Sequence, residues 1–594
     1  IWKDVDGFFT ADPRIVSNAR CLEEVSYEEA MELTYFGAKV ISAKALTPLA
    51  ANGIPCEVRN TYDPSQPGTL VHSEARRTHV VRGISHLHDV SSITLQGGGL
   101  RGRVGIARRV MDALAGESIS ILLIVQSSSE YSITLCVRRA DEQKARKALD
   151  EEFHFERLHG LIEELGVQSD RAVVSLVGEG MKHYRGIAAR FLTAISSARV
   201  NVEVIAQGSS ECAIAVVVRG EDAQSATRAV HTAFFSHSQH IDVILLGCGN
   251  VGAELLDQFQ RQAASLVEHH VDLRVRAIAN SRSLLVADDV IDLGRWREDL
   301  ESHGRPWALD DLIAIRNDLG LLSPTIVDCT TDAELAGQYV KLLDSGFNIV
   351  AANKKANTAD YAYYQSMREA ATRNFRKFLY ETNVAAGLPF IDTLQGLIRS
   401  GDELQTFEGI LSGSLSMIFG LIEDGVPMSQ AVARAMELGY TEPDPRDDLS
   451  GMDVARKLLI VAREVGLELE LDDIQVEAVV PMDEVAHAER SELIDALRAL
   501  DAGFAERTAE AAREEKVLRY VARLENGRCR VTIEPVARSK PLGAVRDGEN
   551  ALVIHTLYYQ PIPMVLRGYG AGAAVTAAGV FGDLLRTVWR PLDN

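Results

Sequence analysis

A cluster of carboxylates precedes one lysine within residues 439–457. The acidic residues are Glu442, Asp444, Asp447, Asp448 and Asp453. Carboxylates this close together repel one another, and a cation such as the ammonium group of a substrate would relieve that repulsion. Lys457, held by Asp453, would then be placed to exchange a proton with a substrate oxygen.

The local pattern determines whether Asp453 and Lys457 can meet. Two prolines and a glycine predict a loop up to Gly451, and the apolar spacing of residues 452–462 predicts a helix. Residues four apart share one face of a helix, so the two side chains are expected to pair. The alternative is a solvated surface pair without a chemical role, which contributes about 0.2–0.5 kcal/mol.

A glycine-rich turn stands between an apolar run and a helical pattern. Residues 241–246 have the composition of a buried strand, and three glycines after it are spaced as GxGxxG. Such a turn brings a pyrophosphate close to a helix N-terminus, whose unpaired N–H groups favour anions. The residues of this predicted dinucleotide site are Gly247, Gly249, Asn250, Val251 and Gly252.

The turn after the next strand bears on the choice of nucleotide. Residues 273–279 predict this strand, which runs into Asn280-Ser281-Arg282. An NAD site usually carries an acidic residue here for the ribose hydroxyls, whereas an arginine can pair with a 2'-phosphate. The sequence therefore favours NADP over NAD, and the alternative is that Arg282 only points to solvent.

Two further predicted strands end in polar turns. Residues 325–328 run into a turn that contains Thr330, and residues 348–351 run into Asn353-Lys354-Lys355. Ligand groups gather at the carboxyl ends of strands in an open parallel sheet. Thr330 and Lys354 are therefore expected beside the nicotinamide and the substrate.

Composition limits the classes of function. At 594 residues the chain is too long for one core, so roughly three to five domains are expected. A net charge of -22 argues against nucleic-acid binding, and no apolar run reaches membrane-spanning length. The seven scattered cysteines lack the spacing of a zinc site or a disulfide framework. A reducing compartment is expected, either the cytoplasm or, in a plant, the plastid stroma.

An internal repeat occupies residues 79–236. Gln126 and Gln207 lie 81 positions apart, and Gly105 and Gly186 share that offset. Each copy is predicted as strand, helix, strand, turn, strand and helix. A polar turn that carries a glutamine between two apolar strands suits a small polar ligand, and the alternative is a pair of purely structural modules.

The first 78 residues predict half of an α/β domain. Residues 2–14 form a turn-rich loop with three carboxylates and an arginine, and residues 56–61 predict a strand. Ser26 and Glu29 have the spacing of a capping box at the start of a predicted helix. From these residues alone, the loop is an acidic surface loop.

This loop and the turn at Gly37-Ala38-Lys39 resemble the C-terminal end of the aspartate kinase catalytic domain. The resemblance implies an ATP-side position for Asp4, Phe9, Arg14 and Lys39. The Lys-Phe-Gly-Gly motif, which supplies the phosphate cradle in that family, is absent from this sequence. The expectation is a longer parent protein with kinase activity and no kinase activity in this chain, which an aspartate-dependent ADP-release assay would test.

The two copies of the repeat resemble tandem ACT domains, which commonly bind amino acids at paired interfaces. In kinases of this family that are fused to a dehydrogenase, the effector is typically threonine. The resemblance implies that Gln126 and Gln207 contact it.

Residues 240–594 resemble homoserine dehydrogenase. The similarity is nearly unbroken over residues 441–457, and it includes residues 568–579, which in that family return to the nucleotide domain near the cofactor phosphates. The implied reaction is a reversible hydride transfer between L-homoserine and L-aspartate 4-semialdehyde with NAD(P). A different class of function, an amino-acid-sensing scaffold without turnover, has no need of the lysine and acidic residues.

The resemblance implies roles for matching residues. Catalysis is implied for Lys457, Lys354 and Asp453, with Lys355 as a rival of Lys354. The implied substrate residues are Glu442, Asp447, Asp448, Ser414 and Gly413, and Ser414 stands where many relatives have threonine. The implied cofactor residues are those of the glycine-rich turn with Arg282, Thr330, Lys354 and Gly572. A monovalent cation, sodium or potassium, is implied at Glu381, Val384, Ala386 and Leu388.

The expected architecture is a multidomain α/β chain. Its expected parts are the end of an amino-acid-kinase domain (1–78), two ACT-like α+β modules (79–160 and 161–236), a Rossmann nucleotide domain (240–385), an α+β substrate and dimerisation domain (386–560) and a return segment (561–594). Relatives pair through the sensing repeats and through sheets of the substrate domain, which implies a homodimer or homotetramer.

Overall fold

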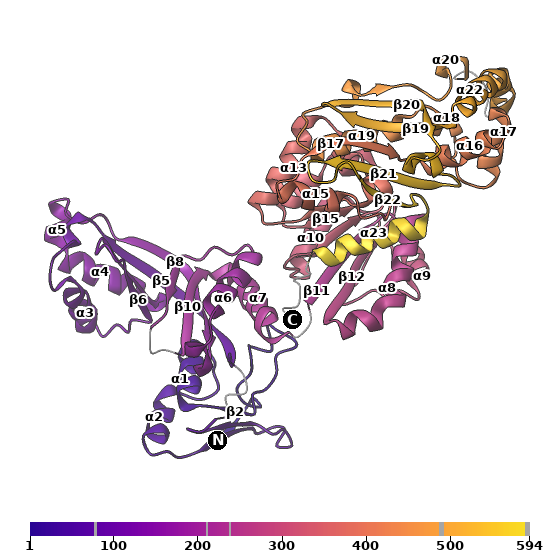
Figure 1. Cartoon of the computed structure of the whole chain (residues 1–594). Coiled ribbons are helices and arrows are strands. Elements are labelled where there is room, and N and C mark those ends of the chain that lie inside the picture. Colours follow the sequence, from indigo (N-terminus) through magenta and orange to yellow (C-terminus); the bar gives the residue numbers. More distant parts are fainter. Residues whose placement is uncertain (76–79, 209–211, 237–238, 486–491, 588–594) are drawn as a thin grey trace. The chain divides into compact units, whose positions relative to one another are not determined.

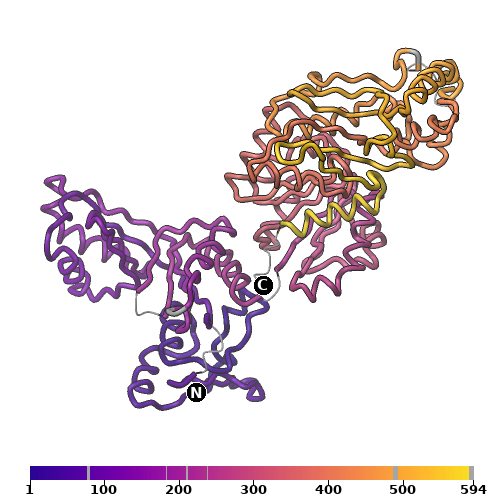
Figure 2. The backbone as a smooth tube through the Cα atoms, viewed as in Figure 1, coloured from indigo at the N-terminus to yellow at the C-terminus, as the bar shows by residue number. Residues whose placement is uncertain are grey.

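The computed structural model describes residues 1–75, 80–208, 212–236, 239–485 and 492–587 (Figure 1). The chain divides into two compact units, residues 1–237 and 238–594, and Figure 2 traces the backbone through both. Within the described ranges, no helix is long and apolar enough to cross a membrane.

The first 75 residues form a small α/β layer. Its four short strands make one sheet in the order β1-β3-β4-β2. The elements are β1 (Trp2–Lys3), β2 (Glu24–Val25), α1 (Tyr27–Tyr35), α2 (Ala43–Ala51), β3 (Cys56–Asn60) and β4 (Thr69–Val71). The predicted capping box is confirmed: the Ser26 hydroxyl accepts from the Glu29 N–H and the Glu29 carboxylate from the Ser26 N–H, both at 3.1 Å.

The repeat forms one antiparallel sheet of six strands in the order β6-β7-β5-β8-β10-β9. The first copy consists of β5 (Gly83–Gln96), α3 (Ile106–Gly116), β6 (Leu123–Gln126), β7 (Ser132–Arg138), α4 (Glu142–Glu152) and the short α5 (His154–Leu158). The second consists of β8 (Gly166–Val177), α6 (Ile187–Ser197), β9 (Val204–Ala206), β10 (Ala213–Arg219) and α7 (Ala223–Phe235). The predicted order of strands and helices in each copy is therefore confirmed.

The repeat is also visible in the backbone angles. Asp89 and Asp170, which lie 81 positions apart in β5 and β8, both have φ of 57°. Gly105 and Gly186 are left-handed, with φ of 94° and 83°, where they begin α3 and α6. Because β5 and β8 pair with each other, each copy obtains a fourth strand from the other. In the second glutamine turn, Ser209, Ser210 and Glu211 lie outside the described residues.

The second unit begins with a mostly parallel sheet in the order β13-β12-β11-β14-β15-β16, in which only β13 is antiparallel to its neighbour. The strands are β11 (Gln239–Leu246), β12 (Val271–Ala279), β13 (Leu284–Val286), β14 (Thr325–Asp328), β15 (Asn348–Ala351) and β16 (Phe378–Leu379). The strands predicted at residues 325–328 and 348–351 are confirmed as β14 and β15. The chain reverses its direction of winding at β11, and such a switch point leaves a crevice at the carboxyl ends of the strands.

Helices cover both faces of the parallel sheet (Figure 1). One apolar cluster joins it to α8 (Asn250–Glu268), α9 (Trp296–His303) and α23 (Ala573–Arg586). The other joins it to α10 (Leu309–Asp318), α12 (Tyr339–Asp344) and α13 (Tyr361–Arg373), beside the four-residue α11 (Ala333–Ala336).

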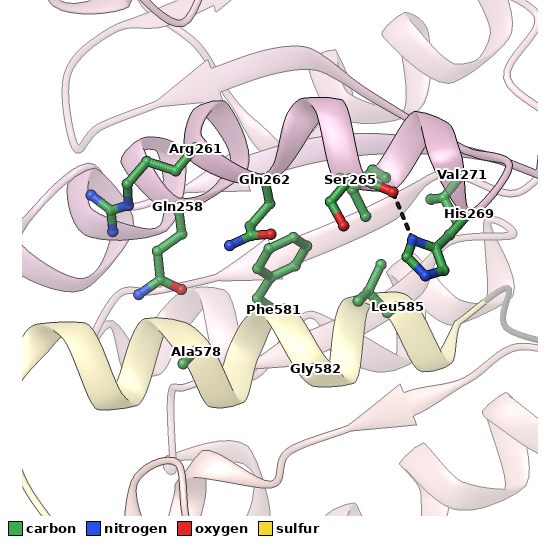
Figure 3. Close-up of a pocket in the computed structure, with 11 residues that line it drawn as sticks. Gln258, Arg261, Gln262, Ser265, His269, Val271, Ala578, Phe581, Gly582 and Leu585 are labelled. Atoms are coloured by element: carbon green, nitrogen blue, oxygen red, sulfur yellow. Dashed lines mark hydrogen bonds between the residues drawn. The ribbon is translucent and has the colours of Figure 1, made fainter.

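Helix α23, near the end of the chain, packs on α8 of this sheet. The Gln258 side-chain amide donates to the Ala574 carbonyl at 2.9 Å, and the Phe259 and Phe581 rings meet edge to face, 5.0 Å between centroids. Figure 3 shows the groove between the two helices, a pocket of about 580 Å³ with Phe581 and Leu585 on one side and Gln262 on the other. Helix α23 therefore packs on the first, parallel sheet, although in sequence it follows the strands of a second sheet.

The second sheet has the order β18-β20-β19-β17-β21-β22 and is mostly antiparallel. Its strands are β17 (Leu404–Ile410), β18 (Gln475–Val476), β19 (Lys516–Glu525), β20 (Arg528–Ala537), β21 (Glu549–Thr556) and β22 (Met564–Tyr569). The accompanying helices are α14 (Thr382–Ala385), α15 (Ile391–Arg399), α16 (Gly413–Glu423), α17 (Met428–Glu437), α18 (Pro445–Leu449), α19 (Met452–Glu464), α20 (Met482–Val485), α21 (Leu493–Leu497) and α22 (Asp501–Arg513). The apolar side chains of α19 are buried in the core that lies between these helices and the second sheet.

The segment before α19 corrects one expectation. A continuous loop was expected up to Gly451, but Pro445–Leu449 form the short helix α18. Proline at the first helical position costs no hydrogen bond, and the Asp444 carboxylate accepts from the Arg446 N–H at 3.0 Å, which caps the helix. Gly451, with φ of 74°, then starts α19, the helix predicted from residue 452.

Candidate active site

Two lysines from different elements share one aspartate. Lys354 follows β15 of the parallel sheet, and its Nζ lies 2.6 Å from Asp453 Oδ1. Lys457 lies one turn after Asp453 on α19, and its Nζ is 2.9 Å from Asp453 Oδ2. Lys457 also donates to the Leu411 carbonyl at 2.6 Å. The carboxylate therefore bridges two cations that are 103 positions apart in the sequence.

These contacts set the charges of the pair on α19. Burial alone would raise the pKa of Asp453, but the charges of Lys457 and Lys354 outweigh it and hold the pKa well below the usual range. Burial lowers the pKa of the Lys457 ammonium although Asp453 opposes the shift, and the Lys354 charge adds to the lowering. The Lys457 side chain is only 11% exposed. A buried lysine whose pKa is lowered gives up its proton more readily than an exposed one, which suits proton transfer.

The structure distinguishes the two neighbouring lysines of the Asn353-Lys354-Lys355 turn. Lys354 reaches Asp453, whereas Lys355 is exposed. The Asn353 amide donates to the Asp328 carboxylate at 3.1 Å and to the Asp332 carbonyl at 2.8 Å, which holds the turn against the end of β14. Lys354 is therefore the lysine of this turn that lies in the site.

Asp328 and Tyr339 support the site and were missed by the sequence analysis. The buried Asp328 carboxylate accepts from the Tyr339 hydroxyl at 2.5 Å and from the Thr330 N–H at 2.7 Å. It thereby fixes both Thr330 and Asn353. The position of Asp328 at the carboxyl end of a predicted strand was a usable signal, but nothing in the sequence connects Tyr339 to it.

The carboxylates before α19 divide into two groups: Glu442, Asp447 and Asp448 form one, and Asp444 stands apart. The Asp448 carboxylate accepts from the Glu442 N–H at 2.8 Å, and burial, together with the charges of Glu442 and Asp453, raises its pKa although the Ser414 hydroxyl opposes the rise. Glu442 and Asp447 are exposed. Asp444 instead pairs with Arg446 at 2.6 Å and caps α18, so the expectation that all five carboxylates face one cation is wrong for Asp444.

The hydroxyl-rich turn lies beside this cluster. The Ser414 hydroxyl donates to the Tyr440 carbonyl at 2.6 Å. Gly413 begins α16, and a Cβ there would lie 3.1 Å from the Gly548 carbonyl oxygen and 3.2 Å from the Ala571 Cβ. The turn is therefore close to the loop before β21 and to the run that leads into α23.

The glycine-rich turn joins β11 to α8 as expected. Gly247 has φ of 93°, and a Cβ on Gly252 would lie 1.9 Å from the Gly247 carbonyl oxygen, so glycine is required at both positions. A Cβ on Gly249 would meet nothing within 4 Å, which leaves that position open to a ligand. Asn250 is the exposed first residue of α8 and Val251 is half-buried.

Other residues of the predicted cofactor set lie on separate turns. Arg282 is exposed, in a turn that the Asn280 side chain stabilises by accepting from the Arg282 N–H at 2.8 Å. Thr330 is half-buried after β14. Gly572, with φ of 115°, precedes α23.

The four residues of the implied cation site lie on one short segment. The Glu381 carboxylate is buried and accepts from the N–H groups of Ile391 (2.6 Å) and Asp392 (2.9 Å). Val384 is buried in α14, Ala386 has φ of 50°, and the Leu388 carbonyl accepts from the Phe390 N–H at 2.8 Å. Burial raises the pKa of Glu381, and the Asp583 carboxylate, whose Oδ2 accepts from the Glu381 N–H, adds to the rise.

The residues predicted from the other resemblances lie in the first unit. Gln126 ends β6 and Gln207 follows β9, and both side chains are exposed at opposite edge strands of the sheet. Asp4 pairs with Lys3 at 3.1 Å and Arg14 with Asp12 at 2.6 Å. Phe9 forms a backbone bridge with Cys21, and Lys39 is exposed after α1.

A glycine-rich turn at a switch point and a buried lysine paired with a carboxylate are both typical of an NAD(P)-dependent oxidoreductase, and family models specify which one. The model described as homoserine dehydrogenase matches residues 389–585, and its NAD binding domain matches residues 247–381. ACT domain models match residues 93–153 and 174–234, and the amino acid kinase family matches residues 1–60. The chain is a homoserine dehydrogenase by class.

Two curated relatives match nearly the whole chain. The bifunctional aspartokinase/homoserine dehydrogenase of Haemophilus influenzae is 48% identical over 589 residues, which is 99% of this chain and 72% of that protein. The protein of the same name from Buchnera aphidicola is 41% identical over 590 residues, with the same coverage of both chains. This chain belongs to the bifunctional aspartokinase/homoserine dehydrogenase family.

A solved structure is similar to part of this chain. A crystal structure of a Candida auris protein of unknown function is 31% identical, covers 59% of this chain and 99% of its own, and superimposes with a TM-score of 0.55.

Proposed function

We propose that Lys354, Asp453 and Lys457 are the catalytic group that interconverts L-homoserine and L-aspartate 4-semialdehyde. The observation that carries the proposal is the Asp453 carboxylate between two lysines, one from the nucleotide-binding sheet and one from α19. A bound nicotinamide would supply or accept the hydride. The protein's part is to hold the substrate oxygen and to move its proton.

In the direction of reduction, negative charge develops on the carbonyl oxygen of the semialdehyde. A protonated Lys457 stabilises that charge and donates its proton to the oxygen. In the opposite direction, the neutral amine takes the proton of the homoserine hydroxyl. Burial lowers the pKa of Lys457, which favours release of its proton, and Asp453 holds the ammonium in place.

The acidic cluster is proposed to bind the substrate ammonium. Asp448 and Glu442 are joined by a hydrogen bond of 2.8 Å from the Glu442 N–H to Asp448, and the Ser414 turn and Asp447 lie nearby. Burial raises the pKa of Asp448, and repulsion from Glu442 and Asp453 adds to the rise, so a cation between the carboxylates would stabilise their charged forms. Holding the ammonium at this end fixes the reacting carbon relative to the lysines.

The cofactor preference is proposed to be NADP. Arg282 is exposed in the turn that follows β12, where its guanidinium is available to a 2'-phosphate. Gly247, Gly249 and Gly252 would place the pyrophosphate at the start of α8, with Asn250, Val251, Thr330 and Gly572 around it.

One assay tests the activity and the nucleotide preference together. With homoserine and NADP, absorbance at 340 nm should rise steadily, and the specificity constant kcat/KM should be higher with NADP than with NAD. An Arg282→Ala variant should lose most of that difference, with the NAD reaction as the internal control. A chain that binds NADP without any homoserine-dependent rise would instead be a sensing scaffold.

A monovalent cation is proposed to bind beside Glu381. Glu381 and Asp583 carry two buried carboxylates, and the Glu381 N–H donates to the Asp583 carboxylate. The Arg586 guanidinium lies 3.0 Å from Asp583 and 3.8 Å from Glu381. A sodium or potassium ion held by the Val384, Ala386 and Leu388 carbonyls would offset this negative charge. Activity in tetramethylammonium buffer, before and after potassium is restored, tests it.

The glutamine turns are proposed to bind threonine. Gln126 and Gln207 occupy equivalent places in the two ACT modules, each exposed at the end of an edge strand of the sheet. The Gln126→Ala and Gln207→Ala variants should each require about tenfold more threonine for half-maximal inhibition, because each loses one amide contact worth about 1–1.5 kcal/mol. The uninhibited rate is the control, and threonine sensitivity equal to that of the unchanged chain would contradict the assignment.

The remaining expectations stay proposals. The domain limits at residues 78, 160, 236, 385 and 560, and the ATP-side positions of Asp4, Phe9, Arg14 and Lys39, follow the family resemblance. A homodimer or homotetramer is proposed, and light scattering on the purified chain measures its mass.

A further inference from the structure

A buried arginine lies near the end of the helix that carries Lys457. The Arg463 side chain is 0% exposed and sits six residues after Lys457 on α19, about 9 Å further along the helix axis. Its guanidinium lies over the Tyr361 and Tyr364 rings, 5.6 and 5.1 Å from their centroids. The proposed reaction does not use this residue.

The contacts of Arg463 join α19 to the segment that follows Lys354. One guanidinium nitrogen, Nη1, donates to the Asn357 carbonyl at 3.0 Å and to the Ala359 carbonyl at 2.8 Å. On its own side of the interface, Nε donates to the Leu469 carbonyl at 3.0 Å and Nη2 to Glu470 at 2.9 Å. Each guanidinium nitrogen therefore has an acceptor.

The segment that Arg463 contacts is hydrogen-bonded directly to the backbone of Lys354. Residues Ala356–Thr358 form a single 3-10 turn, and the Thr358 N–H donates to the Lys354 carbonyl at 3.1 Å. The buried Asn357 amide also donates to the Asn383 side chain at 3.0 Å, and Asn383 donates to the Ala351 carbonyl at the end of β15. Lys354 thus lies between two fixed points, the end of β15 and the turn that Arg463 holds.

We propose that Arg463 is a positioning residue that sets the place of Lys354 relative to Asp453 and Lys457. Helix α19 contacts the Lys354 segment twice, through Asp453 at one end and through Arg463 at the other. The inference rests on the proposed role of Lys354 in catalysis. It adds that the alignment of the two lysines depends on a residue outside the site.

The chemistry of the contact explains why arginine occupies this position. Arginine presents five N–H donors in a rigid fork, so it can satisfy carbonyls of two segments at once, whereas lysine has one nitrogen on a flexible stem. Without the fork, the carbonyls of buried Asn357 and half-buried Ala359 lose a partner and the segment can shift. A displacement of about 1 Å at a reacting group can lower the rate by about 100-fold.

A double-mutant cycle with Lys354 tests the proposal. The variants are Arg463→Met, Lys354→Ala and the two combined, assayed with homoserine at saturating NADP. Arg463→Met should lower kcat by about 100-fold with little change in the dissociation constant of NADP. In the Lys354→Ala background the same substitution should change kcat by less than about twofold, because the residue through which it acts is gone. Glu470 is 50% exposed, so the substitution leaves no buried unpaired carboxylate.

Arg519→Met is the matched control. Arg519 on β19 is another buried arginine: it pairs with Glu423 at the end of α16 at 2.6 Å and donates to the Leu518 and Gly543 carbonyls, all outside the Lys354 segment. Any loss of kcat in this variant should be equal in the presence and absence of Lys354. Arg463→Lys keeps the charge and should fall between Arg463→Met and the unchanged chain, and its cycle with Lys354→Ala decides the question if Arg463→Met does not fold.

Three results would overturn the proposal. Equal losses from Arg463→Met with and without Lys354 would show a general structural role, and an unchanged kcat would show no role. Full turnover by Lys354→Ala alone would remove Lys354 from the mechanism, which is a failure of the proposed function and is visible in that single variant.

Discussion

Replacing Lys457 by alanine is expected to lower kcat by at least about 1,000-fold while the chain still binds NADP. General acid–base catalysis by a positioned group contributes roughly 100- to 10,000-fold, and here the same ammonium also stabilises the developing negative charge. Lys354 cannot take over both tasks, because it comes from a different element and its Nζ lies at the other Asp453 oxygen, Oδ1, whereas Lys457 lies at Oδ2. The glycine-rich turn is untouched by the substitution.

The measurement is the initial rate at 340 nm at saturating homoserine, with NADP binding followed by titration of the same preparation. Lys341→Ala is the control, because Lys341 also pairs with an aspartate, Asp310 at 2.7 Å, but on the surface of α10 and α12. This control should keep its rate within about twofold, since exposed pairs contribute little. A Lys457→Ala variant with a rate near that of the control would remove Lys457 from the mechanism.

The Asp453→Asn variant should shift the pH dependence as well as the rate. Asp453 is the nearest negative charge to Lys457 and raises its pKa against the effects of burial and of the Lys354 charge. The neutral asparagine amide of the variant lacks the negative charge that raises the pKa of Lys457, so this pKa falls further below its usual value. Asp448 is the other carboxylate that acts on Lys457, and it remains in the variant.

The direction of the shift follows from the protonation state that each direction needs. Reduction of the semialdehyde requires protonated Lys457, so its rate is lost as pH rises through the pKa, and the variant should lose it at lower pH. Oxidation of homoserine requires the neutral amine, so its rate rises as pH passes the pKa, and in the variant this rise should also occur at lower pH. A loss of kcat on the order of 100-fold is expected as well, because the lysine is no longer oriented.

Rates of both directions across pH, compared with Asp310→Asn, provide the test. Asp310 belongs to the surface pair with Lys341, so its substitution should leave both limbs in place. Profiles that coincide for Asp453→Asn and the unchanged chain would show that Asp453 does not set the charge of Lys457.

Short-range patterns predicted most of the elements around the site. The glycine spacing after residues 241–246 predicted the turn between β11 and α8, and the i,i+4 pair on α19 predicted the contact between Asp453 and Lys457. Such patterns depend on neighbours a few residues apart, so the sequence carries them directly. The short helix α18 was missed, because the prolines that suggested a loop are equally compatible with the first position of a helix.

Contacts between distant segments needed the structure. Nothing local shows that Lys354, rather than Lys355, reaches Asp453, or that Asp328 binds Tyr339. The sequence gives no sign that Arg463, a basic residue in the last turn of α19, is fully buried against the Lys354 segment.

The sequence by itself determined the chemical groups, their local elements and the family to which the chain belongs. The tertiary structure decided which distant groups act together, above all Lys354 with Asp453. It also showed that Asp444 pairs with its near neighbour Arg446, a local contact that the expected loop did not predict. The physical reason is that helical and turn patterns arise from interactions within a few residues. The pKa of Lys457, in contrast, depends on burial and on a second lysine 103 positions away, which only the packing of α19 against the segment after β15 brings into range.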